Sequence, residues 1–349
     1  MISCRGMVVS LSLLTSVSFA SPLLTFDGVV THRLPKNTAT PSFKSISIST
    51  VKSTSSLMKG LKKKPGLEAA SSGTARHLPT STQLGMNAVP IFDQGNWENS
   101  ALYAIVAGLD ALRGEGDYYS VACSIMLGEF INHHGDEQGQ DIFRDLARAK
   151  EFGLVTKAQQ HQSGCAGVMD DNALDKNTPP SISLEDFHLR SSPLNESGLS
   201  FSRTLLDVPQ WLLQEKPSNS VLERVKTSLY YGNRVLLATL VPVLNDDLGL
   251  VGIYQQKQDA WVMTPRLEQL SKFNELTLPA GYFGLYAMVV TGYDDQAIAV
   301  DKEGHPHQGL LTLRHSWGED VGDQGNFYMS YDYFNVFVVQ LTELMQLQA

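Results

Sequence analysis

The sequence has few cysteines, no internal repeat and, after its first twenty residues, no long apolar run. Three cysteines in 349 residues exclude a disulfide-dense scaffold. The lack of a repeat excludes a solenoid, and no later stretch is long and apolar enough to span a bilayer. Because 42% of the residues are hydrophobic, the chain can bury a large core. We therefore expect one large domain or two packed lobes.

Positive charge is scarce in the body of the chain. Residues 21–85 hold nine Lys and Arg against two acids, which leaves 17 basic and 34 acidic residues in 86–349. Phosphate contacts need Lys and Arg, so this acidic body argues against a nucleic-acid partner. The basic segment could lie on the acidic body by charge attraction or be a disordered spacer, and both interpretations stay open.

The first twenty residues have the layout of a secretory signal peptide. Arg5 gives a positive start, residues 7–19 are apolar with interspersed serines, and small residues near Ala20 mark a cleavage point. A membrane anchor is the alternative. We expect a protein that is secreted or periplasmic, with no membrane attachment after cleavage. Residues 21–76, rich in Ser, Thr and Lys, are expected to form a propeptide-like arm, and the main domain is expected over 77–349.

Helical periodicity comes first within this domain, and strand-like runs come later. Helices are predicted over residues 99–112, 121–131 and 141–152. A loop-rich insertion follows over 165–230. Apolar runs predict strands at 234–243, 287–291, 297–300 and 310–313. This order predicts an α+β protein, with a helical lobe at about 95–230 and a sheet lobe at about 234–345.

Two cysteines remain once Cys4 leaves with the signal peptide. Cys123 and Cys165 form an even pair in an oxidising compartment, which favours a disulfide between them. Two buried free thiols are the alternative. Neither cysteine has a partner histidine motif, so both are interpreted as structural.

Two histidine pairs could suggest a metal ion. Residues 133–137 (HHGDE) follow a helix, but adjacent histidines point in different directions and the segment is a polar loop. Residues 305–307 (HPH) are interpreted as a surface hairpin turn. The sequence therefore predicts no metal site, and it offers no cofactor motif.

Three segments together resemble the signatures of the papain-like (C1) cysteine peptidases. Residues 93–100 (DQGNWENS) open the first helix and are similar to the family's Asp-Gln-Gly-x-x-Gly-Ser-Cys. Residues 286–295 (YAMVVTGYDD) resemble the strand that begins with the family's His and ends in Gly-Tyr. Residues 314–318 (RHSWG) resemble Asn-Ser-Trp-Gly, and a glycine-rich strand follows at 322–328. Each string alone is weak, but their order and spacing are specific. Stretches between 114 and 167 look like a bacterial, secreted branch of the family.

The resemblance implies a papain-like two-lobed fold, with an N-terminal helical lobe and a C-terminal antiparallel β-barrel-like lobe. It also assigns family positions to individual residues: nucleophile Ser100, histidine Tyr286, asparagine His315 and oxyanion-hole glutamine Gln94. The motif that supports the cleft is retained as Trp317 and Gly318.

These replacements remove the chemistry that a papain-type site needs. Such a site holds a thiolate beside an imidazolium, whereas here a hydroxyl faces a phenol. A Tyr side chain with its ordinary pKa of about 10 cannot readily remove the Ser100 proton at neutral pH. Loss of triad members costs on the order of 10⁴ to 10⁶ in turnover.

The sequence therefore predicts a pseudopeptidase, which binds a peptide or protein ligand in the cleft between the lobes without cutting it. The alternative is an active secreted peptidase, a serine-type hydrolase that uses Ser100 as nucleophile with His315 as base.

Overall fold

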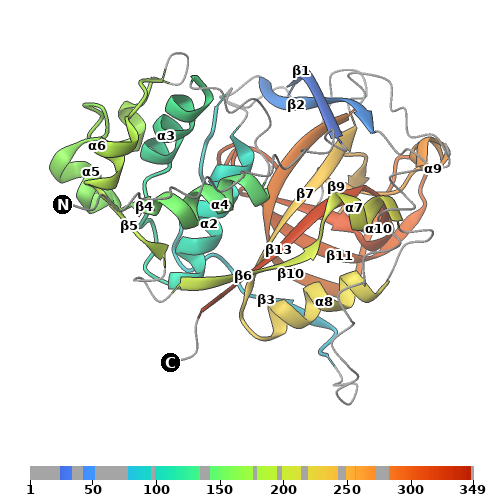
Figure 1. The fold of residues 1–349 in the computed structure, drawn as a ribbon. Helices are drawn as coiled ribbons and strands as arrows, with labels where there is room; N and C mark the ends of the chain where they lie inside the picture. The colour runs from blue at the N-terminus through green and yellow to red at the C-terminus, as the bar shows by residue number, and fades with distance from the viewer. Residues whose placement is uncertain are drawn as a thin grey trace, which may run out of the picture.

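The computed structural model describes two N-terminal strands and most of the chain from residue 78 to residue 346. The described ranges are 24–33, 42–51, 78–95, 99–133, 142–175, 179–194, 199–213, 219–242, 249–255, 257–271 and 283–346. The expected signal peptide and much of the basic arm lie outside them. Figure 1 shows the helices α2 to α6 gathered on one side of the molecule and a large sheet on the other. The predicted mixture of helix and sheet is confirmed.

The helical part is built on α2, which lies between the other helices and the sheet. Its elements are α2 (Ser100–Arg113), α3 (Val121–His133), α4 (Ile142–Phe152), α5 (Lys157–Ser163), the 3₁₀ turn η1 (Asp171–Ala173), α6 (Leu184–His188) and the ribbon of β4 (Leu154–Val155) with β5 (Ser191–Ser192). The three predicted helices are confirmed. α2 ends where Gly114 takes a left-handed conformation, φ 78°, and donates its N–H to the Asp110 carbonyl, a helix stop that glycine allows without strain.

A disulfide ties the helical part together. Cys123 of α3 and Cys165, which follows α5, are bonded with their Cα atoms 5.5 Å apart, and neither residue is exposed. The predicted pairing is confirmed. It closes a loop over a sequence separation of 42 residues, which restrains the unfolded chain.

The sheet contains most of the remaining elements, with β10 at its centre. Its strands are β3 (Ser81–Gln83), β6 (Leu199–Leu206), β7 (Arg234–Pro242), β8 (Gly252–Ile253), β9 (Gln258–Trp261), β10 (Phe283–Val300), β11 (Pro306–Arg314), β12 (Asn326–Ser330) and β13 (Val338–Gln346). Helices α7 (Val208–Leu213), α8 (Asn219–Tyr230), α9 (Pro265–Ser271) and α10 (Tyr331–Phe337) accompany them.

The strand order runs β11-β12-β9-β8-β10-β7-β13-β6, and β10 also pairs with β11. The pairing path from β10 through β11, β12, β9 and β8 thus returns to β10. β7 is buried along its whole length, as a central strand requires.

The structure differs from the sequence-based boundaries at two places. The runs 287–291 and 297–300 belong to the single strand β10, because a register shift between Asp294 and Ile298 absorbs the polar residues that suggested a turn. β6 pairs with β13 at the edge of the sheet, and α8 packs against β7. Residues 199–213 and 219–230, expected in the helical lobe, therefore lie on the sheet side.

The N-terminal arm also contributes strands. β1 (Leu24–Arg33) and β2 (Ser42–Val51) pair antiparallel, and β2 continues onto β10 through the Cα partners Ser47–Gly284 and Ile46–Leu285. Part of the segment interpreted as a mobile arm or spacer is thus paired to the sheet. The backbone N–H and C=O groups at an edge of β10 can form hydrogen bonds with an extended segment that lies beside them.

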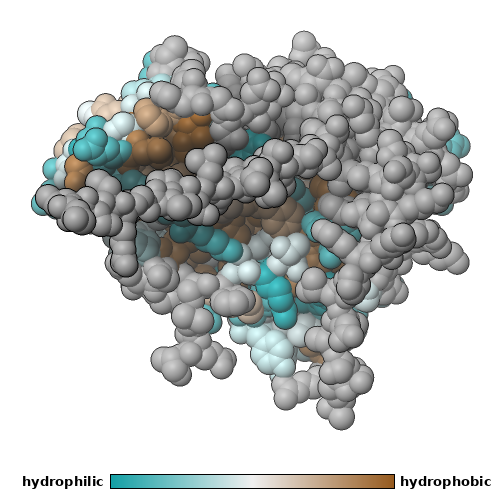
Figure 2. Space-filling model, viewed as in Figure 1, coloured by the Kyte–Doolittle hydropathy of each residue, from teal (hydrophilic) through white to brown (hydrophobic). Residues whose placement is uncertain are grey.

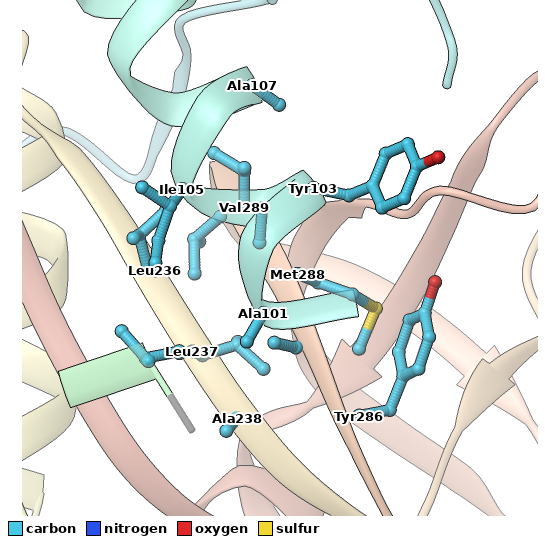
Figure 3. Close-up of a cluster of buried hydrophobic side chains, with 14 of the residues drawn as sticks. Ala101, Tyr103, Ile105, Ala107, Leu236, Leu237, Ala238, Tyr286, Met288 and Val289 are labelled. Carbon is cyan, nitrogen blue, oxygen red and sulfur yellow. The ribbon is translucent and has the colours of Figure 1, made fainter. Parts of the chain in front are cut away.

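The core between α2 and the sheet places the start of the helix beside β10. Figure 3 shows α2 lying across β7 and β10, with Ile105 next to Leu236 and Ala101 above Leu237. The helix approaches β7 so closely at Gly108 that a Cβ there would lie 2.8 Å from the Leu236 Cδ2. A larger residue at this crossing would therefore force the Leu236 side chain to move.

Figure 2 shows brown, hydrophobic residues gathered over the helical part around α3, with hydrophilic residues at its outer edge. Within the described ranges, no helix combines the length and the apolar character that crossing a membrane requires.

Candidate functional site

The segment before α2 is held against the segment after β11. The Gln94 N–H donates to the Ser316 carbonyl at 2.8 Å, and the Gly318 N–H donates to the Phe92 carbonyl at 2.9 Å. Asp93 and Trp317 also form a β-bridge. These backbone bonds bring residues more than two hundred positions apart into one small region.

Ser100 is the first residue of α2, and its side chain is bound to the sheet. Its Oγ accepts a hydrogen bond from the Ala287 N–H of β10 at 3.1 Å, and the residue is 8% exposed. Asn99 stands at the helix N-cap without a side-chain capping bond. The hydroxyl at the expected nucleophile position is therefore engaged by a backbone amide of β10.

Tyr286 of β10 fills the position that the resemblance assigns to the histidine. It is 1% exposed, and its ring stacks on Trp317 with centroids 3.8 Å apart and an interplanar angle of 29°. Burial raises the pKa of this phenol further above its ordinary value of 10. Tyr286 therefore stays neutral and is a poorer base than an exposed tyrosine.

The Tyr286 hydroxyl belongs to a buried hydrogen-bond cluster. It lies 3.3 Å from Gln94 Oε1 and 3.0 Å from Ser316 Oγ, and it accepts the Ser316 N–H at 3.2 Å. Ser316 Oγ in turn donates to Gln94 Oε1 at 2.5 Å. In Figure 3 the Tyr286 hydroxyl points to the same side of α2 as that of Tyr103, away from Leu237. The phenol is held by Gln94 and Ser316 rather than aimed at a reacting group.

His315 is buried and bonded at both ring nitrogens. Its Nε2 lies 3.0 Å from the Val321 carbonyl, which fixes the ring proton on Nε2, and its Nδ1 accepts the Trp317 N–H at 3.1 Å. The ring stacks on Phe327 with centroids 4.3 Å apart. Burial lowers the pKa of His315 to about 3, although the bond to the Val321 carbonyl opposes this shift.

These partners define what the site can do chemically. Gln94 is fully buried, and its Oε1 accepts from within the protein. The cavity between α2 and the sheet measures about 10 Å³ and is lined by Tyr103, Ala287, His315, Ser316 and neighbouring residues. Such a volume holds about one water molecule. Within the part of the chain that the structure describes, the Ser100 hydroxyl is bonded to the Ala287 N–H and not to an imidazole or a carboxylate.

The structure brings most of the predicted site residues together. Gln94, Tyr286 and Trp317 are in contact, Gly318 pairs with the segment before α2, and Ser100 contacts the residue that follows Tyr286. His315 precedes Ser316 and Trp317 in the sequence, but its side chain faces the Val321 carbonyl. The family roles of these positions remain predictions.

Sequence reasoning missed Ser316, which bonds to both Gln94 and Tyr286. Its hydroxyl lies within the motif RHSWG between two residues that were singled out. A polar side chain between two expected site residues was the available signal.

Comparison with known proteins yields structural likeness at low identity. No family model matches the chain, and no curated protein matches it. Among solved structures, xylellain, a cysteine protease from Xylella fastidiosa, is 14% identical, with 94% of this chain and 100% of that chain covered and a TM-score of 0.48. Digestive procathepsin L 3 of Tenebrio molitor larval midgut is 14% identical over 85% and 83%, with a TM-score of 0.43. The bromelain protease from Ananas comosus is 12% identical over 77% and 100%, with a TM-score of 0.42. No residue role is transferred from these structures.

Proposed function

We propose that this chain is a papain-like peptidase homologue that has lost hydrolysis and acts by binding a peptide or protein. The observation that carries the proposal is the engagement of the Ser100 oxygen by the Ala287 N–H while Tyr286 packs on Trp317 beside it. Nucleophilic catalysis needs a base within hydrogen-bond reach of the hydroxyl. Here the position that the resemblance assigns to the base holds Tyr286, a buried phenol with a raised pKa.

The alternative, a hydrolase that uses Ser100 with His315, gains no support. Its base would need a ring nitrogen directed at Ser100, but Nε2 bonds to Val321 and Nδ1 to the Trp317 N–H. Turning the ring would break both bonds and the stacking on Phe327. The lowered pKa of His315 would also make it a weak base at neutral pH.

The binding part of the proposal is supported by the rim of the site. Asp93 is exposed, and Phe92, Gly95 and Gly318 are partly exposed beside it. The cavity that Phe92 lines is too small for a side chain, so a ligand would lie across this rim rather than enter. Partly exposed backbone and an aromatic ring suit an extended peptide.

One experiment with two readouts tests both parts. Fluorescently labelled, unfolded casein is incubated with the wild-type protein, and both its cleavage and its anisotropy are followed. We expect binding without cleavage above buffer. The triple variant Ser100→Cys, Tyr286→His, His315→Asn, shown to be folded by circular dichroism, should gain thiol-dependent cleavage, because it restores a thiolate–imidazole pair with an orienting amide.

Two single variants provide the controls. Phe92→Ala should weaken casein binding, whereas Leu189→Ala, which removes a side chain that is 76% exposed on the helical part, should not. Wild-type cleavage that Ser100→Ala abolishes would refute the loss of hydrolysis. Absence of casein binding, or equal weakening by both alanine variants, would refute binding at the rim.

A further inference from the structure

The wall of the cavity between α2 and the sheet carries two side chains that can donate hydrogen bonds to a ligand. The cavity measures about 10 Å³, and Phe92, Tyr103 of α2 and Arg314 of β11 line it together. The other polar side chains of the wall are engaged, because His315 is bonded at both ring nitrogens and the Ser316 hydroxyl donates to a buried amide. Arg314 and Tyr103 differ from them.

Arg314 is a partly buried cation without a counter-ion. It lies at the end of β11, opposite Val289 of β10 and Asn326 of β12, and its Nε donates to Asn326 Oδ1 at 3.1 Å. Over the described ranges, its guanidinium forms no ion pair and its terminal nitrogens form no hydrogen bond. Burial lowers the pKa of Arg314, and no carboxylate contributes to this shift. A charge partly withdrawn from water without a partner is unfavourable, so an anionic group would stabilise it.

Tyr103 provides a second, independent donor at the same cavity. The residue is only 8% exposed, and its ring packs edge-on against Phe92 with centroids 5.8 Å apart. Figure 3 shows its hydroxyl at the outer end of the ring, on the same side of α2 as that of Tyr286. Among the residues that the structure describes, none forms a hydrogen bond with this hydroxyl. Burial raises the pKa of Tyr103, with smaller contributions from Asp171 and Asp93, so the phenol keeps its proton and can donate it to an acceptor.

The size of the cavity and the nature of the two donors define the group that fits. A volume of about 10 Å³ holds one water-sized atom, and a carboxylate oxygen is an atom of that size. A carboxylate also neutralises a guanidinium and accepts hydrogen bonds at both of its oxygens. A neutral carbonyl would leave the charge of Arg314 uncompensated, and a cation would find only donors.

Asp93 sets a limit on how such an anion can bind. Its carboxylate is exposed on the rim, where Oδ1 accepts the Gly95 N–H at 2.8 Å. The negative charge of Asp93 repels a free anion that approaches from solvent. A carboxylate that belongs to a peptide gains contacts along the rim in addition, and these contacts offset the repulsion. The arrangement therefore favours a peptide carboxylate over a free one.

We propose that Arg314 and Tyr103 bind a carboxylate of the peptide or protein ligand, with one oxygen at the cavity and the rest of the ligand across the rim. This inference rests on the proposed function, because the carboxylate belongs to a ligand that also contacts Phe92. It narrows the ligand to a chain that presents a free C-terminus or an Asp or Glu side chain at this point. Since residues 86–349 hold 34 acidic against 17 basic residues, overall charge does not attract such a ligand, and selection depends on Arg314.

Four peptides of equal length, each with a neutral dansyl label at the N-terminus, test the proposal beside labelled casein. One peptide has a free C-terminus and one is its amide, while two further amides carry either Glu or Gln at one internal position. Binding to the full chain is followed by anisotropy. We expect at least one carboxylate peptide to bind about 10–100-fold more tightly than its neutral match, as a hydrogen bond to a charged group allows. The pair that shows the preference identifies the source of the carboxylate.

Substitutions at the cavity test the two donors separately. Arg314→Gln should abolish the preference for the carboxylate, whereas Arg314→Lys should keep part of it, because the charge remains without the planar fork. Tyr103→Phe preserves the ring and should reduce the preference about 2–10-fold. Arg266→Gln is the matched control, since Arg266 is exposed on α9, and it should keep the full preference. Circular dichroism shows that each variant is folded.

The outcomes separate this inference from the proposed function. If casein binds but the wild type holds both members of each peptide pair equally well, the carboxylate site is refuted and the proposed function stands. A preference that survives unchanged in Arg314→Gln, or that Arg266→Gln abolishes as well, also refutes the site. If neither casein nor any peptide binds, both proposals are refuted.

Discussion

His315 and His307 lie at opposite ends of β11; His315 is buried and His307 is partly buried, and their surroundings differ. His315 has a partner at each nitrogen, the Val321 carbonyl and the Trp317 N–H. His307 has the Asp332 carboxylate 3.0 Å from Nδ1 and the Asp301 carboxylate 3.7 Å from Nε2. Neutral backbone groups hold the first ring, whereas two carboxylates flank the second. The partners of an imidazole, and not its burial alone, therefore decide which interactions hold it in place.

The same contrast extends to the two regions around these histidines. At the candidate site, Tyr286 and Trp317 stack and Gln94 satisfies the phenol, so packing and neutral hydrogen bonds dominate. At the turn, Asp301 and Asp332 flank His307, so charge dominates. We therefore expect substitutions at the first region to change folding stability strongly and those of exposed residues at the second to change it little.

Removing the Tyr286 ring should give the largest effect. Tyr286→Ala deletes a fully buried aromatic side chain and its stacking on Trp317, and should lower the free energy of unfolding by about 3–5 kcal/mol. Tyr286→Phe keeps the ring and removes only the hydroxyl, which should cost about 1–2 kcal/mol because Gln94 and Ser316 still bond to each other. Urea denaturation measures both values. A cost below about 1 kcal/mol for Tyr286→Ala would show that packing does not hold this region.

Much of the architecture was predictable because apolar residues recur at the spacing that places them on the buried face of a helix or strand. The spacing of Ala101, Ile105 and Leu109 predicted α2, and all three are buried in the structure. β6 was missed because Ser202, Arg203 and Thr204 lie on an edge strand, where no continuous apolar run is needed. The single strand β10 was missed because a bulge and a turn have similar polar residues.

The candidate site was predictable in position and less so in its contacts. The motif spacing located Gln94, Ser100 and Tyr286, since strand and helix ends carry the signatures. The hydrogen bonds of Ser316 depend on how the segment after β11 meets the segment before α2, a long-range contact that local pattern does not encode. For the same reason, residues 305–307 were interpreted as a plain turn, since Asp332 is 25 residues beyond His307.

Acidification should give an intermediate effect that is specific to His315. The pKa of His315 is about 3 in the folded state, against 6.5 ordinarily. Between pH 6.5 and pH 3 the His315 side chain therefore binds a proton in the unfolded chain but not in the folded protein. The stability that neutral His315 contributes is complete above pH 6.5 and is lost as pH falls toward 3. We expect the wild type to lose roughly 2–3 kcal/mol more than His315→Gln between pH 7 and pH 4.

The comparison with His315→Gln is needed because other groups titrate in the same range. Burial raises the pKa of Asp110 to about 8, against the opposing hydrogen bonds from Tyr118 and Tyr119. Its contribution has the opposite sign, because a carboxyl with a raised pKa favours the folded state at low pH and loses this contribution as pH rises toward 8. Chemical denaturation of both proteins at several pH values isolates His315. Parallel curves would contradict its lowered pKa.

The smallest effect is expected at the turn between β10 and β11, and it separates the two regions most clearly. Glu303→Gln changes an exposed side chain, so it should alter the free energy of unfolding by less than about 0.5 kcal/mol. Urea denaturation of this variant beside Tyr286→Phe measures the difference. A loss of stability comparable to that of Tyr286→Phe would mean that Glu303 supports the fold as the candidate site does, and the distinction drawn between the two regions would no longer hold.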